Sequence, residues 1–283
     1  MARPFSVHLL PNLFEPEAVR GGIAVICDIL RASTTMTTAL ANGAEAVIAC
    51  DSVEQAEDQR RLLTRGNTVP ATQSDQRVQS VSDERQLETR SEAKPLLGGE
   101  RGGVKIDGFD LGNSPSDYSR ETVAGRTIVF TTTNGTRALL RARAADSVLI
   151  GSFVNLSAIC RRLQADQRPI YIICAGTNGE VTLEDVLFAG AVAERLRETV
   201  SNLRMSDSAE VARSVWKQHC GIASGDESSE TVEVALRISQ GGRNLLRLGY
   251  DSDIHLASQL DSVPVVPEWE NGVLRLQTGV TSV

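Results

Sequence analysis

Three segments of the chain repeat one order of residues: a short apolar run, a cluster of small polar residues, and a stretch with helical periodicity. The apolar runs cover residues 23–27, 127–130 and 170–174 and are rich in β-branched side chains. Continuous apolar strands that alternate with helices are typical of a largely parallel sheet covered by helices on both faces. The sequence therefore predicts an α/β protein.

The length of 283 residues favours one large or two modest domains, and we expect two, residues 1–124 and 125–283. A capping pair at Ser52 and Gln55 predicts a helix that ends near Arg65. The polar stretch 67–94 lacks apolar periodicity and is interpreted as a partly disordered surface insertion. Residues 263–267 contain two prolines, which predicts an extended edge strand.

Charge and cysteine usage exclude several classes of protein. A net charge of -7 argues against nucleic-acid or membrane partners, because both require clustered Lys and Arg. The five cysteines are odd in number and widely spaced, which predicts reduced core thiols. The three histidines do not cluster, so a classical zinc site is not expected. No signal peptide or membrane span is evident, and we expect a cytoplasmic protein. The sequence does not decide whether the protein forms a homo-oligomer.

The polar clusters all follow predicted strands, where loops and helix N-termini collect in parallel sheets and bind ligands. The loop at residues 131–137, Thr-Thr-Thr-Asn-Gly-Thr-Arg, offers many hydroxyl and N–H donors. Such donors suit a small anion such as phosphate or carboxylate. A simple turn and helix cap explains the same residues. The loop at residues 28–35 has similar hydroxyls and adds the carboxylate of Asp28.

Carboxylates in these loops could bind magnesium, which takes oxygen ligands and commonly bridges to a substrate phosphate. The alternative for Asp185 is a capping pair with Thr182 at the start of a helix. Glu184 has no comparable structural explanation. The candidate ligands are Asp28, Glu100, Asp110, Glu184 and Asp185.

Several standard motifs are absent from the sequence. There is no phosphate-binding P-loop, no GxGxxG dinucleotide turn and no HExxH zinc motif. No GxSxG elbow is present, and the histidines lie outside the polar loops, which argues against a Ser/His hydrolase.

Read together, the loops closely resemble the 2-phosphosulfolactate phosphatase family. The resemblance rests on long motifs in order: DILRASTT at 28–35, GGERGG at 98–103, GFDLGNSP at 108–115, TTTNGTRA at 131–138 and CAGTNGEVTLEDVLFAG at 174–190. It covers nearly the whole chain. The polar stretch 67–94 is longer than expected for the family, which bears on access to the site more than on its chemistry.

The resemblance implies a magnesium-dependent phosphatase that hydrolyses (R)-2-phospho-3-sulfolactate to sulfolactate and phosphate, a step toward coenzyme M. It also implies two α/β/α three-layer domains with the active site in the cleft between them. Such a substrate carries phosphate, carboxylate and sulfonate groups. Three anionic groups require several cationic partners, which would explain Arg31, Arg101 and Arg137 in the loops of an acidic protein. Phosphatase activity on another phosphorylated hydroxy acid and non-catalytic anion binding remain alternatives.

We assign roles to individual residues as hypotheses. Asp28 is the first choice as metal ligand, and a nucleophilic role for it stays open. Glu100 or Asp110 orients the attacking water or protonates the leaving alkoxide. The catalytic candidates are Asp28, Arg31, Glu100 and Asp110; the metal candidates are Asp28, Glu184 and Asp185; the substrate-binding candidates are Ser33, Thr34, Arg101, Asn113, Ser114, Thr132, Thr133, Asn134, Gly135, Thr136, Arg137 and Gly176.

Overall fold

The structure, a computed structural model, describes residues 2–65, 94–221 and 228–277. The predicted insertion at 67–94 therefore lies, apart from its last residue, outside the described residues. Eleven strands of the described chain form one hydrogen-bonded sheet with helices on its faces, so the α/β class is confirmed.

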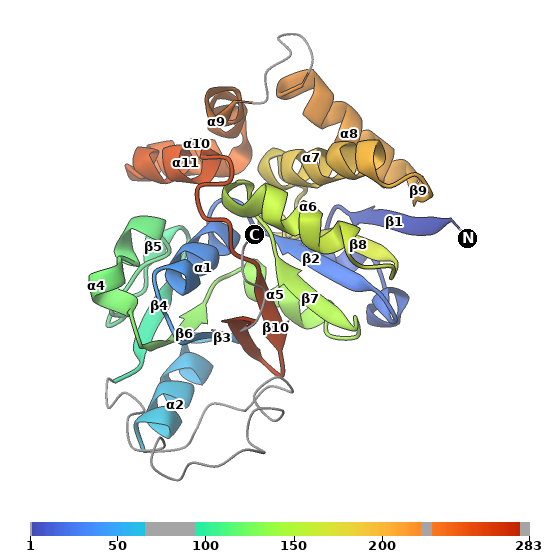
Figure 1. Ribbon diagram of the computed structural model, residues 1–283. Coiled ribbons are helices and arrows are strands. Elements are labelled where there is room, and N and C mark those ends of the chain that lie inside the picture. Colours follow the sequence, from blue (N-terminus) through green and yellow to red (C-terminus); the bar gives the residue numbers. More distant parts are fainter. Residues whose placement is uncertain (1, 66–93, 222–227, 278–283) are drawn as a thin grey trace.

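The sheet consists of two parallel sets of strands joined by a C-terminal hairpin (Figure 1). In the larger set, β2 pairs with β7 and β8, and β1 pairs with β8 and β9. In the smaller set, β6 pairs with β3 and β4. The antiparallel hairpin β10–β11 connects β7 to β3, and β5 lies antiparallel to β4. The strands are β1 (Arg3–His8), β2 (Ile23–Cys27), β3 (Ala46–Cys50), β4 (Leu96–Arg101), β5 (Val104–Lys105), β6 (Thr127–Thr131), β7 (Ser147–Ile150), β8 (Ile170–Cys174), β9 (Leu203–Met205), β10 (Pro267–Glu270) and β11 (Val273–Leu276).

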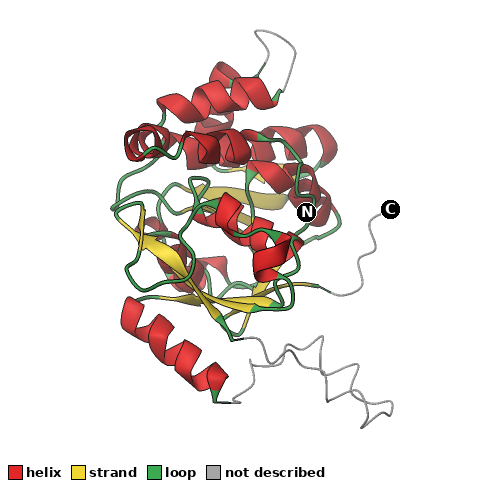
Figure 2. Ribbon diagram, turned by 90° about the vertical axis from the view of Figure 1, so that its left-hand side faces the viewer, coloured by secondary structure: helices red, strands yellow, loops and turns green. Residues whose placement is uncertain are grey.

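The helices form layers around and between the two strand sets (Figure 2). Helices α1 and α5 lie between the sets, α2 covers the outer face of the smaller set, and α6 to α11 lie beyond the larger one. The helices are α1 (Ala32–Ala41), α2 (Val53–Thr64), α4 (Arg120–Val123), α5 (Gly135–Arg141), α6 (Leu156–Gln164), α7 (Leu183–Thr199), α8 (Asp207–His219), α9 (Ser229–Ile238), α10 (Gln240–Leu248) and α11 (Asp251–Ser258).

The continuous apolar character of the strands follows from this layering. Ile23 and Val25 of β2 point into the core shared with α7 and α8, whereas Ala24 and Ile26 point into the core shared with α1 and α5. Every residue of β2 is buried, because helices cover both of its faces. All five cysteines are buried, as expected from their apolar surroundings.

Local predictions had mixed outcomes. Helix α2 begins after Ser52, whose side chain accepts a hydrogen bond from the N–H of Gln55, as predicted. The edge strand predicted at residues 263–267 is wrong: residues 263–266 form no strand, and Pro267 begins β10, which lies inside the sheet between β7 and β11. Pairing from the distant hairpin partner β11 overrode the local signal of the prolines.

The predicted domain boundary at residue 124 lies between α4 and β6. Strands from either side of it alternate in the sheet, since β2 pairs with β7 and β8, and β3 pairs with β6. The division into two domains stays a prediction. Within the described residues, no helix has both the length and the apolar character that a membrane span requires.

Candidate active site

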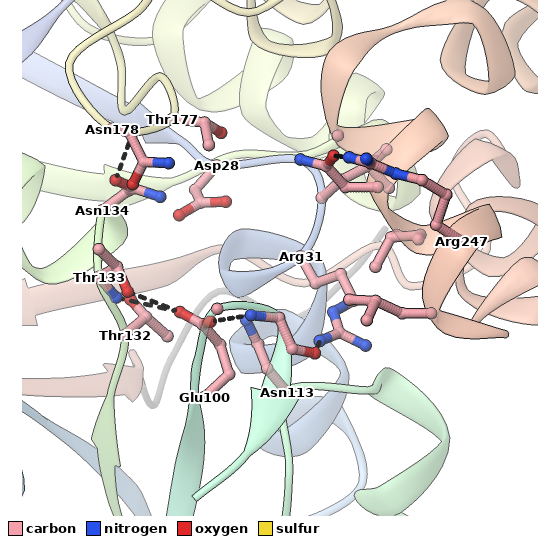
Figure 3. A pocket seen from close by; sticks show the side chains of 17 residues that line it. Asp28, Arg31, Glu100, Asn113, Thr132, Thr133, Asn134, Thr177, Asn178 and Arg247 are labelled. Carbon is pink, nitrogen blue, oxygen red and sulfur yellow. Dashed lines mark hydrogen bonds between the residues drawn. The ribbon is translucent and has the colours of Figure 1, made fainter.

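A cavity of about 490 Å³ opens where the carboxyl ends of strands from both sets meet. Strands β2, β4, β6 and β8 each lead into a loop or turn that reaches it, and α10 forms a further wall (Figure 3). This is the position that parallel sheets use for ligands. The cavity is lined by Asp28, Leu30, Arg31, Glu100, Gly102, Gly103, Asn113, Thr132, Thr133, Asn134, Thr177, Asn178, Gly241, Asn244, Leu245, Arg247 and Leu248.

Asp28 is the first residue after β2 and lines the cavity with only 9 % of its surface exposed. The backbone N–H of Asp28 donates a hydrogen bond to the hydroxyl of Ser33 at 2.9 Å, which fixes the loop. Burial, and next the charge of Glu100, raise the pKa of Asp28 to about 7. A Cβ at Gly135 would lie 3.0 Å from Oδ2 of Asp28, so glycine leaves room for the carboxylate. A carboxyl group that titrates near neutrality is suited to proton transfer or to exchange of a proton for a cation.

Glu100, near the end of β4, joins two loops of the cavity. Its Oε1 accepts hydrogen bonds from the N–H and the hydroxyl of Thr133 at 3.1 and 3.2 Å. Its Oε2 accepts one from the N–H of Gly103 at 2.6 Å. The carboxylate therefore ties the β4–β5 turn to the loop after β6 while still facing the cavity.

Arg31 is 3 % exposed and forms a buried ion pair that the sequence did not indicate. Its Nη1 donates to Oδ2 of Asp253 at 2.7 Å, and its Nη2 donates to the carbonyl of Gly103 at 2.6 Å. Ser114 donates its hydroxyl proton to the other oxygen of Asp253 at 2.6 Å. The guanidinium also lies over the ring of Tyr250, 4.3 Å from its centroid. Arg31 is held rigidly, and Asp253 offsets its charge.

Asp185 and Glu184 lie in the first turn of α7, and neither lines the cavity. The oxygens of Asp185 accept hydrogen bonds from the N–H groups of Ile29 and Gly176, both at 2.9 Å, which joins the loops after β2 and β8. The capping pair expected between Asp185 and Thr182 is wrong, because Thr182 makes no side-chain cap. Burial, together with the charges of Asp28 and Glu184, raises the pKa of Asp185 well above its usual range.

Two of the candidate carboxylates, Asp28 and Glu100, are placed where they could bind magnesium. In the part of the chain that the structure describes, no three His, Cys, Asp or Glu side chains converge as a metal-binding group. Asp28 and Glu100 are the carboxylates that line the cavity. Magnesium is commonly bound by one or two carboxylates, with water and substrate phosphate completing its coordination. Asp28 and Glu100 fit that mode because both line the cavity, whereas Glu184 and Asp185 do not line it.

The remaining predicted residues divide into three groups. Asn113, Thr132, Thr133 and Asn134 line the cavity with Asp28, Arg31 and Glu100. Supporting contacts are made by others: Thr34 donates to the carbonyl of Ile29, Arg101 donates to the hydroxyl of Thr131, and Gly176 donates to Asp185. Three lie apart from the cavity. Asp110 pairs with Arg60 at 3.1 Å and accepts from the N–H of Leu97, while Thr136 and Arg137 line a separate hollow.

Sequence reasoning missed the residues of α10 and the loop residues Thr177 and Asn178 as parts of the site. A signal for α10 exists, since Gly241, Asn244, Leu245 and Leu248 follow the i, i+3, i+4, i+7 spacing of one helix face. That face mixes glycine, amide and leucine, so it does not stand out as either apolar or polar. The loop residues lay inside a matched motif but carry no charge.

Comparison with known proteins gives one consistent result. The profile of the family described as 2-phosphosulpholactate phosphatase matches residues 8–72 and 73–272. A protein of Clostridium perfringens (strain SM101 / Type A), named probable 2-phosphosulfolactate phosphatase, is 34% identical over 97% of both chains. A protein with the same name from Symbiobacterium thermophilum is 36% identical, over 92% of this chain and 97% of its own. Another from Synechococcus sp. (strain RCC307) is 38% identical, over 89% of this chain and 91% of its own.

Proposed function

This chain belongs to the 2-phosphosulfolactate phosphatase family of phosphoric monoester hydrolases, and from that premise we propose that it hydrolyses 2-phosphosulfolactate with magnesium as cofactor. The observation that carries the proposal is the family match, which extends over nearly the whole chain. The products would be sulfolactate and inorganic phosphate, and sulfolactate would enter coenzyme M biosynthesis.

The charges around the cavity support a bound cation. Asp28 and Glu100 oppose Arg31 and Arg247, and Arg31 is already paired with Asp253. The cavity lining thus carries two acidic and two basic side chains, so the three anionic groups of the proposed substrate require additional positive charge. A divalent cation held by Asp28 and Glu100 would supply positive charge beside the phosphoryl oxygens.

The chain's own residues would position the ester. Among the described residues, the hydroxyl of Thr132 and the amide oxygen of Asn113 are buried at the cavity without hydrogen-bond partners. The hydroxyl of Thr132 can donate to an anionic oxygen of the ester, whereas the amide oxygen of Asn113 can only accept a hydrogen bond. Asp253 and Gly103 hold the side chain of Arg31 in the cavity wall. Substrate binding would therefore not have to immobilise this cationic side chain, which saves conformational entropy. Hydrolysis would form a phosphorus–oxygen bond to a water molecule and break the ester bond, and a proton lost by the water would be balanced by the proton that the departing alkoxide takes up.

The test is phosphate release from synthetic 2-phosphosulfolactate by the purified full chain, with magnesium and with a chelator. We expect turnover that requires magnesium and is lost with a chelator. Turnover in the chelator would refute the role of magnesium, and turnover of other phosphorylated hydroxy acids alone would refute the substrate. Failure to hydrolyse any phosphomonoester would refute the enzymatic proposal and favour an anion-binding protein.

A further inference from the structure

Helix α10 forms a wall of the cavity that differs in chemistry from the strand-end loops. Five of its nine residues, Gly241, Asn244, Leu245, Arg247 and Leu248, line the cavity. Figure 3 shows Arg247 on the opposite side of the cavity from Thr132, Thr133 and Asn134. A ligand that fills the cavity therefore contacts the carboxylates at one end and α10 at the other.

Contacts at both ends of α10 hold this wall in place. At its start, the N–H of Gly241 donates to Oε1 of Glu184 at 3.1 Å, and a Cβ at position 241 would lie 2.1 Å from that oxygen. At its end, a Cβ at Gly103 would lie 2.6 Å from Cδ1 of Leu248. The two glycines allow α10 to approach α7 and the β4–β5 turn closely. The position of α10 relative to the carboxylates is therefore built into the fold.

Arg247 is the cavity's cation that is free to meet an anion. The other lining cation, Arg31, has its charge offset by Asp253. Among the described residues, Arg247 has no ion pair, and its Nη2 donates to the amide oxygen of Asn244. Its side chain is exposed at the rim of the cavity. Asn244 also lines the cavity, and its hydrogen bond orients the guanidinium of Arg247 along this wall.

We infer that Arg247, oriented by Asn244, binds the sulfonate of the substrate and so determines which phosphate ester the enzyme prefers; this inference rests on the proposed function. The phosphate must lie beside Asp28 and Glu100, where the proposed cation would be held. The sulfonate is on the carbon next to the one that bears the phosphate, and in this arrangement it faces α10. A sulfonate is ionised at every physiological pH and presents three acceptor oxygens, which suits the forked donors of a guanidinium.

The test compares 2-phosphosulfolactate with 2-phospholactate, which keeps the phosphate and carboxylate but lacks the sulfonate. For Arg247→Gln we expect KM for 2-phosphosulfolactate to rise roughly 10- to 100-fold, the effect of losing a charged hydrogen bond, with kcat nearly unchanged. KM for 2-phospholactate should change little. The matched control is Arg243→Gln, an exposed arginine of the same helix outside the cavity, which should leave both substrates unaffected.

An equal rise in KM for both substrates, or no rise for either, would overturn the inference. Binding of 3-sulfolactate and lactate, measured by calorimetry, gives a readout independent of turnover. The wild-type chain should bind 3-sulfolactate more tightly than lactate, and Arg247→Gln should abolish that preference. If no phosphomonoester were hydrolysed, the proposed function would fail while this measurement still decided the role of Arg247: equal affinities in the wild type would overturn it.

Discussion

The two walls of the cavity are built in different ways. The strand-end wall carries buried carboxylates, and Glu100 and Asp185 each accept backbone or hydroxyl donors on both of their oxygens. The helical wall carries Asn244 and the exposed Arg247, whose described contact is within the helix itself. Rigid buried groups suit steps that need exact alignment, whereas exposed side chains can change without disturbing the core. In our proposals, bond breaking belongs to the first wall and substrate choice to the second.

The largest effect should come from the strand-end wall at Asp28. Asp28→Asn removes the carboxylate that we propose as magnesium ligand while keeping its volume. We expect hydrolysis to fall by about 1,000-fold, the scale seen when one key electrostatic group of an active site is lost. Phosphate release and circular dichroism should show an inactive but folded chain. A rate within tenfold of the wild type would contradict the assignment of Asp28 to the chemical step.

Asp253 lies on α11, behind the cavity lining, and pairs with the lining residue Arg31 at 2.7 Å. Asp253→Ala leaves the buried guanidinium without its partner, and we expect a loss of about 3–5 kcal/mol in the free energy of unfolding. The matched control is Asp251→Ala on the same helix, whose ion pair with Arg237 is exposed and should matter little. Urea unfolding measures both variants. Similar losses for the two would show that the buried pair has no special role.

The glycine contact of the helical wall should have a smaller effect. In Gly241→Ala the new Cβ would overlap Oε1 of Glu184, so either the buried Glu184 side chain or α10 must shift. We expect a destabilisation of about 1–3 kcal/mol, typical of overpacking. The same substitution in a Glu184→Ala background should cost less, because the opposing oxygen is gone. Thermal unfolding of the four chains of this double-mutant cycle checks the coupling, and simple additivity would rule out the steric explanation.

The last prediction concerns the pH dependence of stability at Asp28. Its pKa in the folded chain is about 7, above its ordinary value of 3.8, so the folded state binds the proton more tightly than the unfolded state. The associated stability is complete below pH 4 and is lost as pH rises to 7, by at most about 1.4 kcal/mol per pH unit. Asp28→Asn should therefore gain stability relative to the wild type between pH 5 and 7. A difference independent of pH in metal-free urea unfolding would contradict the raised pKa.

The fold class and the strand-end wall were predictable because their signals are local. The apolar runs ending at Cys27, Phe130 and Cys174 predict strands, and the polar residues after them lie where parallel strands collect ligands. Asp28 and Thr132 were found in this way, whereas Glu100 was identified from the Gly-rich sequence 98–103. Roles were harder to predict, since Asp185 resembles a helix cap or a metal ligand in the sequence and in fact joins two loops through backbone N–H groups.

By itself, the sequence determined the strands with continuous apolar runs, such as β2, β6 and β8, the polar loops that follow them and the membership of the family, because each is encoded in consecutive residues or in motifs of fixed spacing. Tertiary structure alone decided that Asp253 pairs with Arg31, 222 residues away, and that α10 closes the cavity. The hairpin β10–β11 likewise enters the middle of the sheet only through pairing with β7 and β3. The physical reason is that a buried ion pair or a strand pairing depends on which distant partner the packed core brings into reach, and no local pattern encodes that partner.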